Sequence, residues 1–307
     1  MCVACIVLSC CARPKDANLT AFANATSTLA TAAKNASSLD VQIDAKLRAA
    51  AAANNYAAGL PSKFDPKGGT FITGKSDADW KAVTAFLDAV NGYATALSQA
   101  NDAKLVGGVT GGITSLGTAL ANANAASALA NPNNQQRINL ISGAVADLVG
   151  VVGNGYAAIE IRAAMNEAQP ILQAARGPLK DSLKIVFADA TSKLEDYKQA
   201  LRCRLSIAGA RPGTQASCPP GKDIHVADAA PPTSLEKYDA YLAAWQDYLA
   251  IQASVQALGN LPAAVDAMIA AHEKLKDDPD NSAALAGFLQ AVGDIAAKEG
   301  QFEALNG

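Results

Sequence analysis

Two cysteines in the second half of the chain are spaced for a disulfide bond. Cys203 and Cys218 are the only cysteines beyond residue 11, and they bracket a Gly- and Pro-containing segment at 207–213. Isolated pairs of this kind are typical of oxidising compartments. Closing a loop of this size stabilises a fold by about 3 kcal/mol in the chain-entropy model. We therefore expect a disulfide that fastens a loop to a helix end in a periplasm or at a cell surface; the alternative is two free thiols.

A second group with binding chemistry lies near residue 245. Tyr241, Trp245 and Tyr248 share one face at helical spacing. Aromatic rings with polar tips bind sugars or aromatic ligands when they are gathered on one surface. These three residues are therefore a candidate ligand face. The alternative is that they are the large-residue layer of an alanine-rich core.

Catalytic constellations are missing from the sequence. It contains no G-x-S-x-G, no H-E-x-x-H, no P-loop and no dinucleotide-binding fingerprint. The two histidines, His225 and His272, stand alone, without the Cys–His or His–His spacing of a metal site. We predict a protein that is not an enzyme, with no catalytic residue, no metal and no cofactor.

The first eleven residues carry a pattern that concerns localisation. An apolar run at 3–8 ends in Val7-Leu8-Ser9-Cys10, which resembles the lipobox of bacterial lipoproteins. The resemblance implies a signal peptide before Cys10 and acylation of Cys10 with chains such as palmitate. It also implies a membrane anchor, because two or more acyl chains keep a protein stably bound to a membrane. Cys11, in place of an aspartate, is compatible with the outer membrane. The expected location is the bacterial cell envelope, facing the periplasm or the surface.

The segment before Cys10 departs from that class. Nine residues and no basic side chain precede Cys10, whereas a secretory signal has a basic segment and a longer apolar core. The alternatives are a start further upstream, an uninformative apolar end, or a metal site built on the C-x-x-C pair Cys2 and Cys5. The apolar residues between these cysteines disfavour zinc, whose ligands are usually held by turn residues.

Composition predicts an all-α fold. Hydrophobic residues make up 50% of the chain, but aromatics only 5% and charged residues 17%, because alanine supplies much of the apolar content. Such a composition suits helices packed through small side chains and disfavours a β-sandwich. The net charge of −3 and the scattered basic residues favour no nucleic-acid partner. We expect an elongated bundle of about seven or eight amphipathic helices, some of them coiled-coil-like.

Helical periodicity sets the expected organisation. Residues 1–15 are predicted to be the signal, anchor and tether, and 16–307 a single extended helical-bundle domain. The first helix is expected over 16–58. The clearest coiled-coil pattern follows it, with apolar residues at alternating three and four spacing: Trp80, Val83, Leu87, Val90, Ala94 and Leu97.

The middle of the chain is rich in glycine. Two overlapping G-x-x-x-G pairs, Gly107/Gly111 and Gly108/Gly112, lie within 105–120. Each glycine costs a helix roughly 1 kcal/mol relative to alanine, so close backbone approach to a neighbouring helix is the expected compensation. Segment 105–160 is predicted to form a helical hairpin buried in the bundle. The alternative is a membrane-active hairpin that leaves the soluble form.

Prolines and caps divide the second half. Pro170 is expected to kink a helix, and Gly177–Pro178 to end it. Segment 206–233 is expected to be irregular. Thr233 to Glu236 forms a capping box that opens a helix, and a separate shorter helix is expected from about Pro262.

Together these patterns predict a membrane-anchored envelope lipoprotein whose helical bundle is a protein-binding or spacer module. Its expected partners are the membrane, through the lipid, and another envelope protein. Two alternatives stay open: a membrane-active protein using the 105–160 hairpin, and a small-ligand binder using the Tyr241, Trp245 and Tyr248 face.

Overall fold

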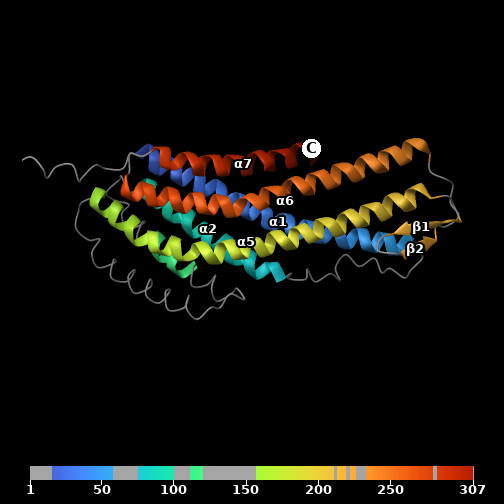
Figure 1. The fold of residues 1–307 in the computed structure, drawn as a ribbon, viewed down its shortest axis with the longest axis horizontal. Coiled ribbons are helices and arrows are strands. Elements are labelled where there is room, and N and C mark those ends of the chain that lie inside the picture. Colours follow the sequence, from blue (N-terminus) through green and yellow to red (C-terminus); the bar gives the residue numbers. More distant parts are fainter. Residues whose placement is uncertain are drawn as a thin grey trace, which may run out of the picture. The chain divides into compact units, whose positions relative to one another are not determined.

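The computed structural model confirms an all-α helical bundle. It describes residues 16–57, 75–99, 111–119, 157–210, 213–218, 222–225, 233–278 and 282–306. These contain six helical segments, against the seven or eight expected for the whole chain. Five are long (Figure 1), namely α1 (Asp16–Ala57), α2 (Lys75–Gln99), α5 (Ala157–Gly209), α6 (Ser234–Asp277) and α7 (Ser282–Asn306), and the sixth spans 111–119. The predicted signal and anchor over 1–15 lie outside the described residues.

The chain divides into two compact units. Unit 1 comprises Met1–Lys34, Lys75–Ile185 and Asn260–Ala296, and unit 2 comprises Asn35–Gly74, Val186–Gly259 and Ala297–Gly307. Helices α1, α5, α6 and α7 each contribute one part to each unit. Unit 1 also holds α2 and the 111–119 segment, so it assembles its core from more helices than unit 2 does. The single domain expected over 16–307 stays a prediction.

The core of unit 1 confirms the apolar pattern read from α2. All six residues of that pattern are buried, and Phe86 and Tyr93 join them on the same helix. Three-and-four spacing places these side chains on one stripe of the helix, which faces the other helices of the unit. The first helix also matches its prediction, because α1 ends at Ala57, one residue before the expected end.

Gly112 confirms the expected close approach of backbones. A Cβ atom built on Gly112 would lie 2.8 Å from the Cα atom of Tyr93 in α2. Real Cβ atoms do not come so near, so only glycine permits this packing. At Gly111, by contrast, a Cβ atom would meet nothing within 4 Å. One of the two described G-x-x-x-G glycines is therefore required by packing, while the rest of the predicted hairpin lies mostly outside the described residues.

The predicted helix end at Gly177–Pro178 is wrong, because α5 continues through Pro170 and Pro178 to Gly209. A proline inside a helix removes one hydrogen bond and costs about 3 kcal/mol. Ala168 and Leu172 are buried on either side of Pro170, and Ala175 and Leu179 are buried on either side of Pro178. Burial of this stripe outweighs the local cost. The kink expected at Pro170 stays a prediction.

The separate helix expected from Pro262 is also wrong. Helix α6 runs unbroken from Ser234 to Asp277 with Pro262 inside it. Leu258, Leu261 and Val265 are all buried around the proline, so continuous packing again outweighs the lost hydrogen bond.

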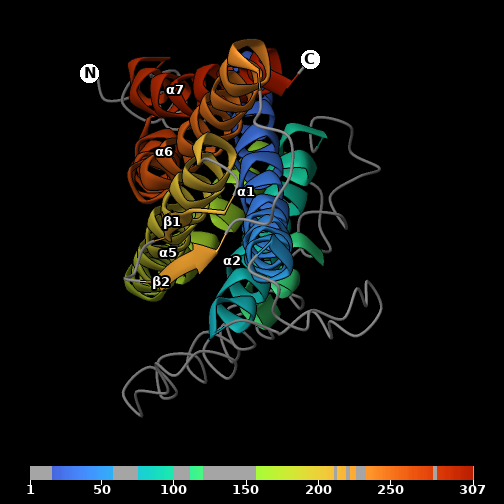
Figure 2. The same ribbon diagram turned by 90° about the vertical axis from the view of Figure 1, so that its right-hand side faces the viewer.

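Part of the segment expected to be irregular forms a small hairpin. Strand β1 (Gln215–Cys218) pairs antiparallel with β2 (Lys222–His225), with Gln215 opposite His225 and Cys218 opposite Lys222. Cys203, near the end of α5, forms the predicted disulfide with Cys218, which places the hairpin beside the end of α5 (Figure 2). Ile207 packs against the two cysteines. The expectation of a loop fastened to a helix end is therefore met by a hairpin.

Candidate binding surface on α6

Helix α6 begins with the capping box predicted from its sequence. The Thr233 backbone N–H donates to Glu236 Oε2 at 2.7 Å, and the Glu236 N–H donates to Thr233 Oγ1 at 3.2 Å. These reciprocal bonds pair backbone donors that a helix start leaves open. The hydrogen bonds from the Thr233 backbone and side chain lower the pKa of Glu236. The cap fixes the start of the helix directly before its first exposed leucine.

Within unit 2, one face of α6 packs inward. Its inward residues recur at spacings of four and three, and all are buried or partly buried: Ala244, Tyr248, Ile251, Val255 and Leu258. This spacing produces a single apolar stripe along the helix. This buried stripe is the face through which α6 packs within unit 2.

A second apolar face of α6 is exposed. It consists of residues spaced by three and four along about four turns, flanked by one further tyrosine: Leu235 (68% exposed), Tyr238 (63%), Leu242 (42%), Trp245 (46%), Leu249 (38%) and, beside them, Tyr241 (54%). We call this set the α6 stripe. At 100° per residue it lies on the side of the helix away from the inward face. The next positions in the same pattern are polar, Gln252 and Gln256, so the α6 stripe is a bounded patch.

The aromatic rings of this region meet edge to face. The ring centroids of Tyr241 and Trp245 are 6.5 Å apart at an interplanar angle of 71°, and those of Trp245 and Tyr248 are 6.3 Å apart at 78°. The three predicted residues are thus brought together. Their rings do not form a flat platform of the kind on which a sugar ring stacks, and Tyr248 turns partly inward, where Lys198 Nζ lies 6.0 Å from its ring centroid.

Polar contacts hold α6 against its neighbours in unit 2. Asp247 receives Lys46 Nζ of α1 at 3.1 Å and the Tyr197 hydroxyl of α5 at 3.4 Å. Burial, and then the charge of Asp247, raise the pKa of Tyr197 to about 12. Tyr197 therefore stays a neutral donor at physiological pH. These contacts orient the helix so that its second face points outward.

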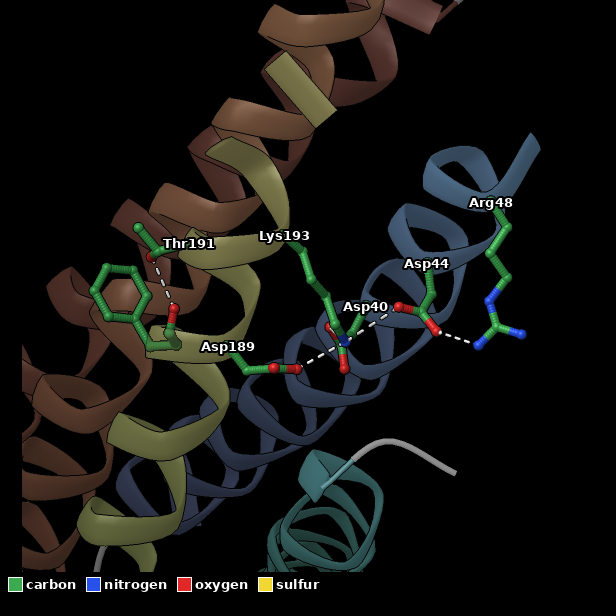
Figure 3. Close-up of polar contacts among 7 residues, drawn as sticks. Asp40, Asp44, Arg48, Asp189, Thr191 and Lys193 are labelled. Carbon is green, nitrogen blue, oxygen red and sulfur yellow. Dashed lines mark hydrogen bonds and ion pairs between the residues drawn. The ribbon is translucent and has the colours of Figure 1, made fainter. Parts of the chain in front are cut away.

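A second polar cluster joins α1 to α5 in unit 2 (Figure 3). Lys193 of α5 lies between carboxylates, with Nζ 2.7 Å from both Asp40 and Asp189 and 3.8 Å from Asp44. Arg48 contacts Asp44 at 3.0 Å. Burial lowers the pKa of Lys193, but the hydrogen bonds from Asp189 and Asp40 outweigh it and raise that pKa. Lys193 therefore stays charged, and its ammonium links α5 to α1 through ion pairs with carboxylates.

Unit 1 contains a buried polar group that sequence reasoning did not find. His272 of α6 is fully buried; its Nδ1 lies 2.6 Å from Gln169 Oε1, and its Nε2 lies 2.9 Å from the Tyr93 hydroxyl. The consistent assignment is that His272 donates from Nδ1 to Gln169 and that Tyr93 donates to Nε2. Phe22 packs beside the imidazole at 5.8 Å.

The environment of His272 keeps the ring neutral. Burial, and then the nearby charge of Lys276, lower its pKa to about 3, and burial raises the pKa of Tyr93. No motif marks this site, because its partners lie 103 and 179 residues away in the sequence. A neutral imidazole with both nitrogens engaged in a core is a structural hydrogen-bonding element, and we assign it no chemistry.

The remaining predictions concern the acylated cysteine, metal sites and the membrane. Cys10 lies outside the described residues, so its acylation stays a prediction. In the described part of the chain, no group of three or more His, Cys, Asp or Glu residues is placed to hold a metal ion. Among the same residues, no helix is both long and apolar enough to cross a membrane.

The fold and the surface define a class: a helical-bundle protein with a disulfide-fastened hairpin and an exposed aromatic and leucine stripe on one long helix. Beyond the class, no protein-family model, no curated protein and no solved structure matches the chain. The function is therefore argued from the surface itself.

Proposed function

We propose that this chain is a lipid-anchored bacterial envelope protein whose helical bundle is a protein-binding module, and that the α6 stripe is its binding surface. The stripe is the observation that carries the proposal. It groups six large apolar or aromatic side chains, each more than a third exposed, on one helix. A contiguous exposed patch of this kind marks an interaction site, whereas single exposed apolar residues do not.

The composition of the stripe supports a protein partner. Tyrosine and tryptophan are enriched at the centres of protein interfaces, where they fill pockets and lose little conformational freedom. The three-and-four spacing of the stripe repeats the pattern by which helices pack on helices. The edge-to-face rings give less support to the small-ligand alternative. The 111–119 segment buries Ile113 and Leu116 in unit 1, which likewise gives no support to a hairpin released into a membrane.

The envelope part of the proposal rests on the lipobox resemblance and on the Cys203–Cys218 disulfide. Its test is the intact mass and detergent partitioning of the protein expressed from its own gene, beside a Cys10→Ala variant. We expect a mature chain that begins at Cys10 with added acyl mass, lost in the variant. An unmodified chain that retains residues 1–9 contradicts the anchor and leaves the stripe unaffected.

Crosslinking in intact cells tests the binding part. A photo-reactive phenylalanine analogue at position 245 is compared with the same analogue at Thr191, an exposed position on α5 of the same unit. We expect a discrete crosslinked protein species from position 245 alone. That species must disappear with Leu242→Glu and persist with Ile185→Glu, an equally exposed aliphatic residue off the stripe. Equal crosslinking at both positions refutes the binding surface.

A further inference from the structure

We propose that the partner seated on the α6 stripe is a second copy of this chain, paired antiparallel through the two α6 stripes. This inference deepens the proposed function, on which it rests, by naming the partner. Its starting observation is that α6 in unit 2 has two apolar faces, of which only one is covered. A helix that is apolar on both sides is stable in water when both sides are buried.

The geometry of the stripe selects a helix as its cover. Its spacing assigns Leu235, Leu242 and Leu249 to one position of a seven-residue repeat and Tyr238 and Trp245 to the other. Such alternation forms knobs that fit the holes of a facing helix. A flat surface does not fill the spaces between these knobs.

The order of residue types favours an antiparallel copy. One repeat position holds leucine every time, and the other holds an aromatic ring. In an antiparallel pair the two positions face each other, so Leu242 meets Trp245 and Leu249 meets Tyr238 of the second copy, while Leu235 at the end of the pair meets Gln252. A parallel pair would place leucine on leucine and Trp245 on Trp245. Facing a large side chain with a smaller one gives the better interdigitation, and an antiparallel pair closes with two-fold symmetry.

The flanking positions are compatible with a second copy. The residues at the positions that flank the leucine and aromatic repeat are Asp239, Tyr241, Gln246 and Tyr248. They carry one charge per copy, so pairing places no ladder of like charges along the interface. The tyrosine hydroxyls stay at the edge, in contact with water.

The area of the stripe is sufficient for a dimer. Aromatic side chains bury about 150–250 Å² each, and the stripe residues are about half exposed, which gives roughly 600 Å² per copy. Two copies would then cover roughly 1,200 Å², at the lower end of specific stable interfaces.

The first test is the association state of the purified full chain, measured by sedimentation, together with co-purification of two differently tagged copies from one cell. We expect a dimer in the wild type. Leu242→Glu places a carboxylate near the two-fold axis and should raise the dimer Kd at least about 100-fold. Ile185→Glu is the matched control, since Ile185 is 43% exposed against 42% for Leu242, and it should leave the dimer unchanged.

Charge-swapped pairs separate loss of binding from loss of folding and also test the orientation. A Leu242→Glu copy and a Leu242→Lys copy, each monomeric alone, should co-purify, because position 242 lies within about one turn of the axis. Leu249→Glu with Leu249→Lys should not co-purify, because in the antiparallel pair these positions lie far from each other. Co-purification of the second pair overturns the antiparallel arrangement.

The outcomes distinguish this inference from the proposed function. If the wild-type chain stays monomeric up to about 100 μM and does not co-purify with its tagged copy, the proposal that the partner is a second copy is wrong. If position 245 still crosslinks to a different protein, the α6 stripe is a binding surface and only the identity of the partner is wrong. If position 245 crosslinks to nothing, both the binding surface and the second copy are wrong.

Discussion

The two parts of α6 differ in how far their apolar residues are covered. In unit 1, from residue 260 onward, Leu261, Val265 and Met268 are all buried. In unit 2, from Ser234 to Gly259, the same helix has one buried face and one exposed stripe. The two parts differ in amino-acid types, because all four aromatic residues of α6 lie in the unit 2 part, and they also differ in the number of helices in their unit. We propose that a partner covers the exposed face of α6 in unit 2.

The units also differ in what holds them together. Unit 1 relies on a large apolar core with a buried histidine network, and its backbones approach closely at Gly112. Unit 2 adds a disulfide to a smaller core, while both units have ion pairs between helices, at Lys193 in unit 2 and at Asp266 in unit 1. Small cores commonly need such covalent or polar reinforcement.

Matched leucines on α6 give the largest contrast. Leu261→Ala removes a fully packed side chain from unit 1 and should lower the free energy of unfolding by about 2–5 kcal/mol. Leu242→Ala in unit 2 should lower it by less than about 1 kcal/mol when the protein is dilute enough to be monomeric. Denaturant titration measures both values. Similar losses for the two leucines would mean that the stripe is already covered within the chain.

Loss of the disulfide should affect unit 2 alone. The double variant Cys203→Ser with Cys218→Ser releases a loop of fifteen residues and should destabilise unit 2 by about 3 kcal/mol. Amide hydrogen exchange resolves the two units. We expect faster exchange in the part of α5 near Cys203 and unchanged exchange in α2. Equal acceleration in both would show that the units do not unfold separately.

Two neighbouring glycines should respond with opposite sign. Gly112→Ala forces a Cβ atom against the Tyr93 backbone, so the free energy of unfolding should fall by about 1–3 kcal/mol. Gly111→Ala meets open space and should raise it by up to about 1 kcal/mol, because alanine favours helix. Thermal unfolding of the two variants measures the difference. A tolerated Gly112→Ala would contradict the close approach in unit 1.

Acid should weaken unit 1 through His272. The pKa of His272 is lowered from the ordinary 6.5 to about 3, so the unfolded chain binds a proton more readily than the folded chain between these values. Its contribution to stability is complete above pH 6.5 and is lost as the pH falls toward about 3. The pH profile of unfolding should therefore be steeper for the wild type than for His272→Gln.

NMR titration of the imidazole provides a check on this prediction that does not depend on the variant folding. The His272 ring should stay neutral from pH 7 to pH 4. A ring that titrates near pH 6.5 would show that the core admits the charged form.

Local features of the fold were accessible from the sequence. The capping box at Thr233 and Glu236 lies within four residues, and the α2 pattern lies within one helix, so neither depends on distant parts of the chain. The disulfide was also predictable, because the two cysteines have no other candidate nearby. The helix breaks at Gly177–Pro178 and Pro262 were wrong because long buried stripes outweigh a local proline penalty.

The candidate site was only partly predictable. Spacing brought Tyr241, Trp245 and Tyr248 together, but a sequence does not show which face of a two-faced helix its neighbours cover. The repeat of Leu235, Tyr238, Leu242, Trp245 and Leu249 was the signal that would have identified the stripe. The His272 network gave no signal, since its three members come from three separate helices.

The central claim, that a protein covers the α6 stripe, is tested most directly by footprinting Trp245 with hydroxyl radicals. The measurement compares intact cells with dilute purified protein and uses Phe187, an exposed ring on α5, as the internal reference. We predict that oxidation of Trp245 relative to Phe187 falls several-fold in cells. An unchanged ratio would mean that the stripe faces water in the cell, and it would contradict the account.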